Sequence, residues 1–144
     1  MTPAVAPTPD LFCQIAAGRL PAAVVTRTPE LVAFLDHRPV FKGHVLIAPV
    51  AHVDTLLDLP ADLMQPLLSL AARVATALGA ALGAQGTFVA MNNVVSQSVP
   101  HLHLHVVPRT RGDGLRGFFW PRTRYAGDEM EAYARRVAEA LPAG

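Results

Sequence analysis

The feature that most constrains this chain is the segment PHLHLHVVPR at residues 100–109, in which His101, His103 and His105 alternate with leucine and valine. Because side chains on a β-strand point to opposite faces with a period of two, this pattern predicts a strand with three imidazoles on one face and apolar side chains on the other. The row would extend about 13 Å at roughly 3.3 Å per residue, enough to line a small cleft. Half of the six histidines lie in this segment, so we expect one face to pack in the core and the other to do chemistry.

Composition limits the classes of protein to which the chain can belong. Its 144 residues, 51% hydrophobic and 16% charged, predict one folded domain at residues 10–144 and exclude a disordered chain. The surplus of apolar residues leaves surface that a homodimer could cover. A formal net charge of +1 provides no overall field to attract nucleic acid or a membrane. Five arginines at residues 109–124, opposed by Asp113 alone, form either a solvated loop or a region that attracts polyphosphate.

The N-terminus and the cysteine content bear on the cellular compartment. Residues 1–9 contain three prolines and neither a basic region nor a long apolar run, so we interpret them as a disordered lead-in and not as a signal peptide. Cys13 is the single cysteine, which excludes an intrachain disulfide, and we therefore expect a cytoplasmic protein. The apolar stretch at residues 67–82 contains Arg73 and is shorter than the roughly 20 residues of a membrane span.

Periodicity and turn residues predict an α+β fold, with a five-stranded, meander-like antiparallel sheet, a long helix and a C-terminal helix. The strand of histidines is expected to follow four earlier strands, at residues 21–26, 30–36, 43–49 and 87–91. The helices are expected at residues 11–18, 61–82 and 128–141. Asp10 is the expected N-cap of the first helix, and Asp128 with Glu131 has the spacing of a capping box at the last.

Three interpretations of the alternating histidines compete. They could be surface histidines without a special role, although such a row would occupy strand positions without adding to packing. They could bind zinc, but residues 92–112 contain no acidic residue of the kind often found near a catalytic zinc. They could supply a nucleophile, because an imidazole nitrogen attacks phosphorus well when its other nitrogen donates a hydrogen bond, and neighbouring imidazoles can balance the charge of the phosphate.

With these residues in view, PHLHLHVVPR resembles the His-φ-His-φ-His-φ-φ motif of the histidine triad (HIT) superfamily of nucleotide hydrolases and transferases. The resemblance continues in the order of the segments, which are LFCQIAAGRLPAAVV, VAFLDHRPVFKGHVLIAPVAH and MNNVVSQSVPHLHLHVVPR. It covers the chain from about Asp10 to Arg109, over two thirds of its length. It implies the fold of that superfamily and a homodimer.

The resemblance implies roles for four histidines. His103 matches the nucleophile, which attacks the α-phosphorus of a nucleoside polyphosphate or phosphoramidate and forms a covalent nucleotidyl-imidazole that water then hydrolyses. His101 matches the residue whose backbone carbonyl holds the other ring nitrogen of the nucleophile, and His105 matches the residue that contacts the phosphate and the leaving group. His44 resembles a fourth histidine of the active site. Such an arrangement meets the negative charge of the phosphate with donors that are already in place.

Other segments match the substrate-binding positions of the superfamily. Gln97 and Ser98 lie where relatives have phosphate-contacting side chains, each able to donate to an oxygen. Either Asn92 or Asn93 is expected to approach the phosphate or the ribose. Asp36 matches the acid that accepts hydrogen bonds from the ribose hydroxyls. The apolar base pocket is expected from three residues that could equally be ordinary core, Phe12, Ile15 and Phe34.

The N-terminal segment departs from the pattern of many bacterial relatives, in which Cys-x-x-Cys and two histidines bind a structural zinc. Here Asp10 replaces the first cysteine and Cys13 keeps the second, while His52 and His101 match the two histidines. The resemblance therefore implies either a structural zinc held by these four residues, since zinc accepts a carboxylate oxygen, or a small buried cysteine without a metal. No cofactor is expected to be required for catalysis.

The sequence thus predicts a cytoplasmic, homodimeric enzyme that cleaves dinucleoside polyphosphates or nucleoside phosphoramidates at the α-phosphate and releases a nucleotide such as AMP. Two alternatives stay open. One is a nucleotidyl transferase or phosphorylase that uses the same covalent intermediate, and the other is a nucleotide-binding regulator with little turnover. The segment from Phe118 to Trp120 is suited either to stacking on a base or to packing across the dimer.

Overall fold

A computed structural model of the chain describes residues 10–116 and 121–144. The predicted lead-in at residues 1–9 and the segment from Phe118 to Trp120 lie outside the described residues. The chain divides into two compact units, one that ends at Asp113 and one that runs from Gly114 to Gly144. Each is described by itself, and the expectation of a single domain stays a prediction.

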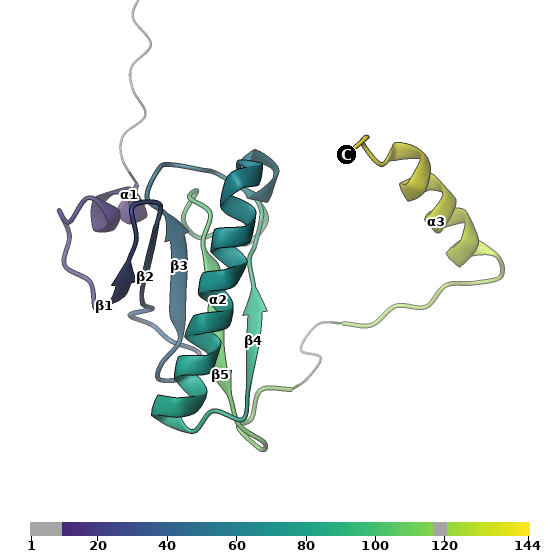
Figure 1. Ribbon diagram of the computed structural model, residues 1–144. Helices are drawn as coiled ribbons and strands as arrows, with labels where there is room; N and C mark the ends of the chain where they lie inside the picture. Colours follow the sequence, from purple (N-terminus) through teal and green to yellow (C-terminus); the bar gives the residue numbers. More distant parts are fainter. Residues whose placement is uncertain (1–9, 117–120) are drawn as a thin grey trace, which may run out of the picture. The chain divides into compact units, whose positions relative to one another are not determined.

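The first unit is built on a five-stranded antiparallel sheet, as predicted. The strands are β1 (Val24–Arg27), β2 (Leu31–Leu35), β3 (Val45–Pro49), β4 (Gly86–Ala90) and β5 (Leu104–Arg109). Their order across the sheet is β1-β2-β3-β5-β4, so the expected meander is wrong after β3. The long helix α2 (Ala61–Leu82) carries the chain from β3 past one strand position to β4 at the edge, and β5 then pairs with both β3 and β4 (Figure 1).

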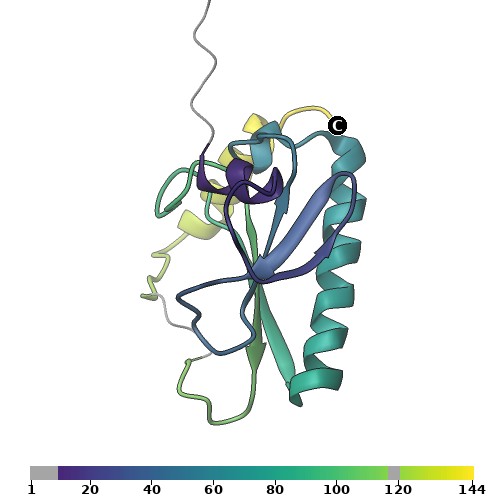
Figure 2. The ribbon, with the colours of Figure 1, turned by 90° about the vertical axis from the view of Figure 1, so that its left-hand side faces the viewer.

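The two faces of the sheet are covered by different helices, which Figure 2 shows on opposite sides. Successive side chains of β2 and β3 point to opposite faces of the sheet, as the period of two requires, and both faces are largely buried. One face packs with α2 (Ala61–Leu82) in a cluster that includes Leu31, Ala33, Val45 and Ile47. The other packs with α1 (Leu11–Ala16) in a cluster made of Phe12, Ile15, Val32, Phe34, Leu46 and Ala48.

Helix α2 has the predicted bounds and the predicted amphipathic face. Its buried residues recur at spacings of three and four, and they are Leu67, Leu70, Ala71, Val74 and Leu78. The helix ends at Gly83, whose φ of 70° lies in the left-handed region. Among the described residues, α2 as a whole is long and apolar enough to cross a membrane by length and composition, although the apolar stretch at residues 67–82 within it is shorter than a span. A helix that packs an apolar face on a sheet passes the same test.

Gly43 sets the approach of β3 to the end of α2. Its φ is +103°, and a Cβ atom at this position would come within 2.5 Å of Leu82 Cδ1. The backbone conformation therefore favours glycine here, while the close contact involves only the end of the exposed Leu82 side chain. The close approach fixes the position of the next residue, His44, which enters the functional site.

The helix ends show where local sequence signals hold. Asp10 caps α1 as predicted, because its Oδ1 accepts a hydrogen bond from the Cys13 amide at 2.8 Å. In the second unit, α3 (Glu129–Ala140) begins after Asp128, whose side chain makes no capping bond. The predicted capping box is wrong, since Glu129 instead accepts a hydrogen bond from the Ala126 amide at 2.7 Å. The large apolar side chains of α3 and of the residue after it are exposed, namely Met130, Tyr133, Val137 and Leu141.

Candidate active site and metal cluster

The histidine segment lies partly before its strand. β5 begins at Leu104, so the prediction that His101 and His103 lie within the strand is wrong. The Leu102 amide donates to the carbonyl of Val53 at 2.6 Å, outside the sheet ladder. The alternation nevertheless holds, because the apolar residues of the segment pack in the cluster under α2, whereas His103 faces α1 with its ring edge-to-face with Phe12 at 4.8 Å.

His103 is held so that one ring nitrogen is available for bonding. Its Nδ1 lies 2.7 Å from the backbone carbonyl oxygen of His101, and because a carbonyl only accepts, Nδ1 carries the proton. The neutral ring therefore has its lone pair on Nε2. His103 is 5% exposed, and burial lowers its pKa, although the bond to the carbonyl acts in the opposite direction. The ring is thus neutral and nucleophilic at neutral pH.

A chain of hydrogen bonds fixes the protons on His44 and His105. The Val40 amide donates to His44 Nδ1 at 3.1 Å, so the neutral ring of His44 carries its proton on Nε2. That Nε2 lies 2.9 Å from Nδ1 of His105 and donates to it. His105 consequently carries its proton on Nε2. Burial, with the nearby His103 and His44, lowers the pKa of His105 to about 4, so this neutral donor form persists at neutral pH.

His103 and His105 border a cavity of about 570 Å³ on the α1 side of the sheet. Seven residues that the sequence predicted for the site line it, namely Phe12, Ile15, Phe34, Asp36, Ser98, His103 and His105. The three apolar residues among them also belong to the buried cluster beneath α1, so both of their expected roles are compatible with their positions. Asp36 Oδ1 accepts from the Arg38 amide at 2.9 Å, which fixes the carboxylate at the end of β2.

The other predicted polar residues are turned into the loop before the histidines. Gln97 donates from Nε2 to the carbonyl of Asp54 at 2.6 Å and accepts at Oε1 from the Val94 amide at 3.0 Å. Asn92 donates to the Ser96 carbonyl. Asn93 accepts from the amide of Leu56, in the short helix η1 (Leu56–Asp58). These three amides stabilise the loop in this structure, and their contact with a substrate stays a prediction.

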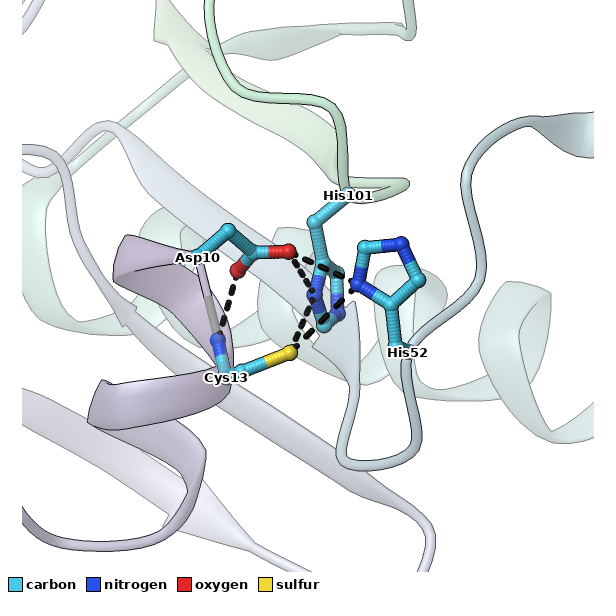
Figure 3. A group of neighbouring side chains, drawn as sticks. All are labelled: Asp10, Cys13, His52 and His101. Carbon is cyan, nitrogen blue, oxygen red and sulfur yellow. Dashed lines mark hydrogen bonds and ion pairs between the residues drawn. The ribbon is translucent and has the colours of Figure 1, made fainter. Parts of the chain in front are cut away.

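Behind the histidine segment, the four residues predicted to bind zinc lie together. Asp10 and Cys13 come from the start of α1, His52 from the loop after β3, and His101 from the segment before β5 (Figure 3). Cys13 Sγ lies 3.4 Å from His52 Nδ1 and 3.3 Å from His101 Nδ1. Asp10 Oδ2 lies 2.7 Å from His52 Nδ1 and 3.1 Å from His101 Nδ1. Four possible ligand atoms thus converge on one point.

The surroundings of this cluster fit a tetrahedral metal site. His101 Nε2 donates to the Pro49 carbonyl at 2.8 Å, and His52 Nε2 to Asp54 at 2.5 Å, so each ring turns its Nδ1 towards the cluster. Zinc bonds of about 2.0–2.3 Å place neighbouring ligand atoms roughly 3.3–3.6 Å apart, close to the sulfur–nitrogen separations seen here. The donor set of a thiolate, a carboxylate and two imidazoles suits zinc.

The protonation of the cluster argues against a reactive thiol. Burial and the neighbouring Asp10 carboxylate raise the pKa of Cys13, which is the opposite of an activated cysteine. Burial raises the pKa of Asp10, but the Cys13 amide and the nearby His101 outweigh burial and lower it overall. The hydrogen bond to Asp54 raises the pKa of His52. The cysteine therefore serves as a ligand or a packing residue.

A second group of possible ligands, Asp36, His44 and His105, fits a metal poorly. The Val40 amide occupies one nitrogen of His44, and the other nitrogen is bonded to Nδ1 of His105. The atoms that a metal would need are thus already used in hydrogen bonds.

Sequence reasoning missed the groups that orient the site residues. These are the amide of Val40, the carbonyl of Pro49 and the carboxylate of Asp54. The backbone groups leave no trace in the sequence. The pair His52 and Asp54, two residues apart, was a readable signal for a histidine oriented by a carboxylate.

Comparisons with known proteins agree with this geometry. A family described as the HIT domain matches residues 17–112. An uncharacterised HIT-like protein of Mycobacterium tuberculosis is 35% identical over 92% of this chain and 93% of its own length. An adenosine 5′-monophosphoramidase of Schizosaccharomyces pombe is 28% identical over 91% of this chain and 97% of its own. A zinc-bound histidine triad family protein of Mycobacterium smegmatis has a similar structure, with a TM-score of 0.70, 32% identity, and coverage of 91% of this chain and 96% of that one.

Proposed function

The chain belongs to the HIT-domain family, and from that premise we propose that it is a nucleotide hydrolase in which His103 attacks the α-phosphorus. One observation carries the proposal. His103 donates from Nδ1 to the His101 carbonyl at 2.7 Å, which leaves the Nε2 lone pair available in a cavity shared with the donor His105. The phosphoramidase name of the fission yeast relative supports a reaction of this class.

In the first step, Nε2 of His103 forms a bond to the α-phosphorus while the bond from phosphorus to the leaving nitrogen or oxygen breaks. The electron pair of that bond goes to the leaving atom, which takes the proton it needs from solvent. The imidazole becomes cationic, and its Nδ1–H stays bonded to the His101 carbonyl. The Nε2–H of His105 donates to the phosphate or the leaving atom, where charge develops.

In the second step, water attacks the phosphorus and the nitrogen–phosphorus bond breaks. The electron pair returns to Nε2 of His103, the proton of the water goes to solvent, and a nucleoside monophosphate is released. A hydrogen-bond relay, in which the Val40 amide donates to His44 and His44 donates to His105, keeps the donor proton of His105 on Nε2 in both steps. Neither step calls on a catalytic metal or another cofactor.

The proposed substrates are nucleoside phosphoramidates, such as adenosine phosphoramidate, and dinucleoside polyphosphates. In this proposal Asp36 accepts from the ribose hydroxyls and Ser98 donates to the phosphate, and both line the cavity. Gln97, Asn92 or Asn93 would reach the phosphate only after exchanging the loop bonds that they make here. The base would lie against the apolar wall made of Phe12, Ile15 and Phe34.

We further propose that the cluster of Asp10, Cys13, His52 and His101 holds a structural zinc. Zinc would supply a cross-link between α1 and two loops of the sheet, and no chemistry at the phosphate. A homodimer in the cytoplasm completes the proposal.

The homodimer is supported by exposed apolar residues on α2 and on the edge strand β4, such as Leu68 and Val89. Sedimentation analysis checks the dimer, which a monomer at micromolar concentration would contradict.

The test of the proposed function is turnover of a substrate panel by the wild-type protein and the variant His103→Asn. Asparagine can still donate to the His101 carbonyl but lacks the nucleophilic nitrogen. We expect release of a nucleoside monophosphate by the wild type, none by the variant, and binding of AMP by both. Products in which inorganic phosphate, and not water, has accepted the nucleotidyl group would indicate a phosphorylase. AMP binding without turnover of any substrate would indicate a regulator and contradict the hydrolase.

A further inference from the structure

The short helix α1 takes part in both sites at once. Leu11, Phe12 and Ile15 line the nucleotide cavity, whereas Cys13 and the N-cap Asp10 belong to the metal cluster. A helix of six residues is not stable in isolation, so its position depends on tertiary contacts. Any group that strengthens or weakens those contacts also moves a wall of the cavity.

Two kinds of contact hold α1, and they differ in character. One does not involve the cluster: Phe12 packs edge-to-face on Phe34 at 5.4 Å, and Arg27 donates to the carbonyls of Ala16 and Ile15 at the end of the helix. The other is the metal cluster at the start of the helix (Figure 3). The beginning of α1 is thus held by the side chains of the cluster, and their contacts with one another depend on whether a metal lies among them.

In the absence of a metal, the side chains of the cluster are held together by hydrogen bonds and ion pairs, such as the 2.7 Å contact between Asp10 Oδ2 and His52 Nδ1. His101 donates a hydrogen bond from Nε2 to the Pro49 carbonyl, so its Nδ1 faces the cluster. This Nδ1 lies 3.1 Å from the carboxylate oxygen of Asp10 and 3.3 Å from the sulfur of Cys13. A divalent metal would replace these contacts by direct bonds between α1 and the body of the fold.

We propose that a metal bound by Asp10, Cys13, His52 and His101 holds the start of α1 in place against the sheet and thereby raises the affinity of the cavity for nucleotide. We call this action the clasp. Asp10 and Cys13 are positioning residues in this proposal, because they act through the helix and do not touch the nucleotide. The proposal rests on the proposed function, since it requires that the cavity bind a nucleotide.

The path between the two sites is short. Phe12 is the residue next to Cys13, and its ring lies edge-to-face with His103 at 4.8 Å inside the cavity. His101 provides a second connection, because its ring belongs to the cluster while its carbonyl accepts from His103. By linkage, nucleotide must raise metal affinity by the same factor as metal raises nucleotide affinity, and couplings of this kind typically amount to about 5- to 150-fold.

The experiment compares the full chain in metal-free and zinc-loaded forms. Calorimetry gives the Kd of AMP for each form, and competition with a chromophoric chelator gives the Kd of zinc with and without saturating AMP. We expect both dissociation constants to fall by the same factor, in the range of about 5- to 150-fold. Equal AMP affinity in the two forms would overturn the clasp and leave the proposed function intact. Failure of both forms to bind AMP would overturn the proposed function itself, and failure to bind zinc would overturn the clasp.

Variants at residue 10 separate the metal from the helix cap. Asp10→Asn keeps a good N-cap but removes the anionic ligand, so we expect weaker zinc binding and an AMP affinity that no longer responds to zinc. Asp10→Cys restores a soft ligand, and we expect tighter zinc binding with the coupling retained. Asp62→Asn, an exposed change in the first turn of α2, is the matched control and should alter neither affinity. Coupling that survives in Asp10→Asn at equal zinc occupancy would contradict the proposal.

Hydrogen exchange supplies a readout without any nucleotide. Removal of the metal should speed exchange of the α1 amides while the amides of β3 and β5 stay protected. Unchanged protection of α1, or loss of protection throughout the sheet, would overturn the clasp. The first result would show that the metal does not hold the helix, and the second that it supports the whole fold.

Discussion

His44 performs two separable tasks with its two ring nitrogens, and a pair of substitutions can divide them. Its Nδ1 accepts from the Val40 amide at 3.1 Å, and its Nε2 donates to His105 at 2.9 Å. The oxygen of asparagine can take the place of Nδ1, whereas the amide nitrogen of glutamine can take the place of Nε2. His44→Asn should therefore keep the bond to Val40 and lose the relay, and His44→Gln should do the reverse.

The structure gives the size of each effect. Loss of the relay leaves the proton of His105 free to sit on the wrong nitrogen, and removal of such an orienting partner typically costs about 10- to 100-fold in activity. Loss of the acceptor leaves the Val40 amide without its partner, which costs about 1–3 kcal/mol when the group is buried. Val40 is 51% exposed, so water can replace much of that bond and we expect the lower end, about 1 kcal/mol.

The assays are urea denaturation and kcat/KM for adenosine phosphoramidate. We expect His44→Asn to lower kcat/KM by about 10- to 100-fold with little change in the free energy of unfolding. His44→Gln should keep most of the activity and lose about 1 kcal/mol of stability. Full activity in His44→Asn, or an equal loss of activity in both variants, would refute the inferred relay.

Three further predictions concern stability and the thiol. Because burial lowers the pKa of His105 to about 4 in the folded chain, from about 6.5 when unfolded, the unfolded chain binds more protons between these values, and the urea midpoint should fall as the pH is lowered through this window; a midpoint independent of pH there would count against the buried neutral ring. Gly43→Ala should lose about 1–3 kcal/mol of stability, chiefly from the φ of +103°, and Leu82→Ala in the same chain should recover little of it; full recovery would show that the backbone is unstrained. Cys13 should react with iodoacetamide more slowly than a cysteine in the urea-unfolded chain, since its pKa is raised, and faster reaction would contradict the assigned protonation.

Much of the fold followed from local patterns. The long helix was predicted with its observed bounds, residues 61–82, because its apolar residues keep one period throughout. Asp10 was recognised as a cap from its residue type and position. The place of β5 between β3 and β4 was not predictable in this way, because it depends on where α2 crosses the sheet.

The candidate site was predictable to the extent that its residues act through their side-chain types. The alternation in the histidine segment and the resemblance to the HIT superfamily brought His44, His103 and Asp10 into consideration. The structure places His103 at the cavity, Asp10 in the metal cluster and His44 in contact with His105. The protons on the rings were not predictable, since they are set by the Val40 amide and by backbone carbonyls. The orientation of Gln97 into its own loop likewise follows from tertiary contacts alone.

The most direct test of the central claim is mass spectrometry of the wild-type chain, quenched within milliseconds of mixing with adenosine phosphoramidate. We predict an acid-labile adenylyl adduct on His103, which is absent in His103→Asn. Turnover without an adduct on this residue, or an adduct that forms on another residue and accounts for the turnover, would contradict nucleophilic catalysis by His103.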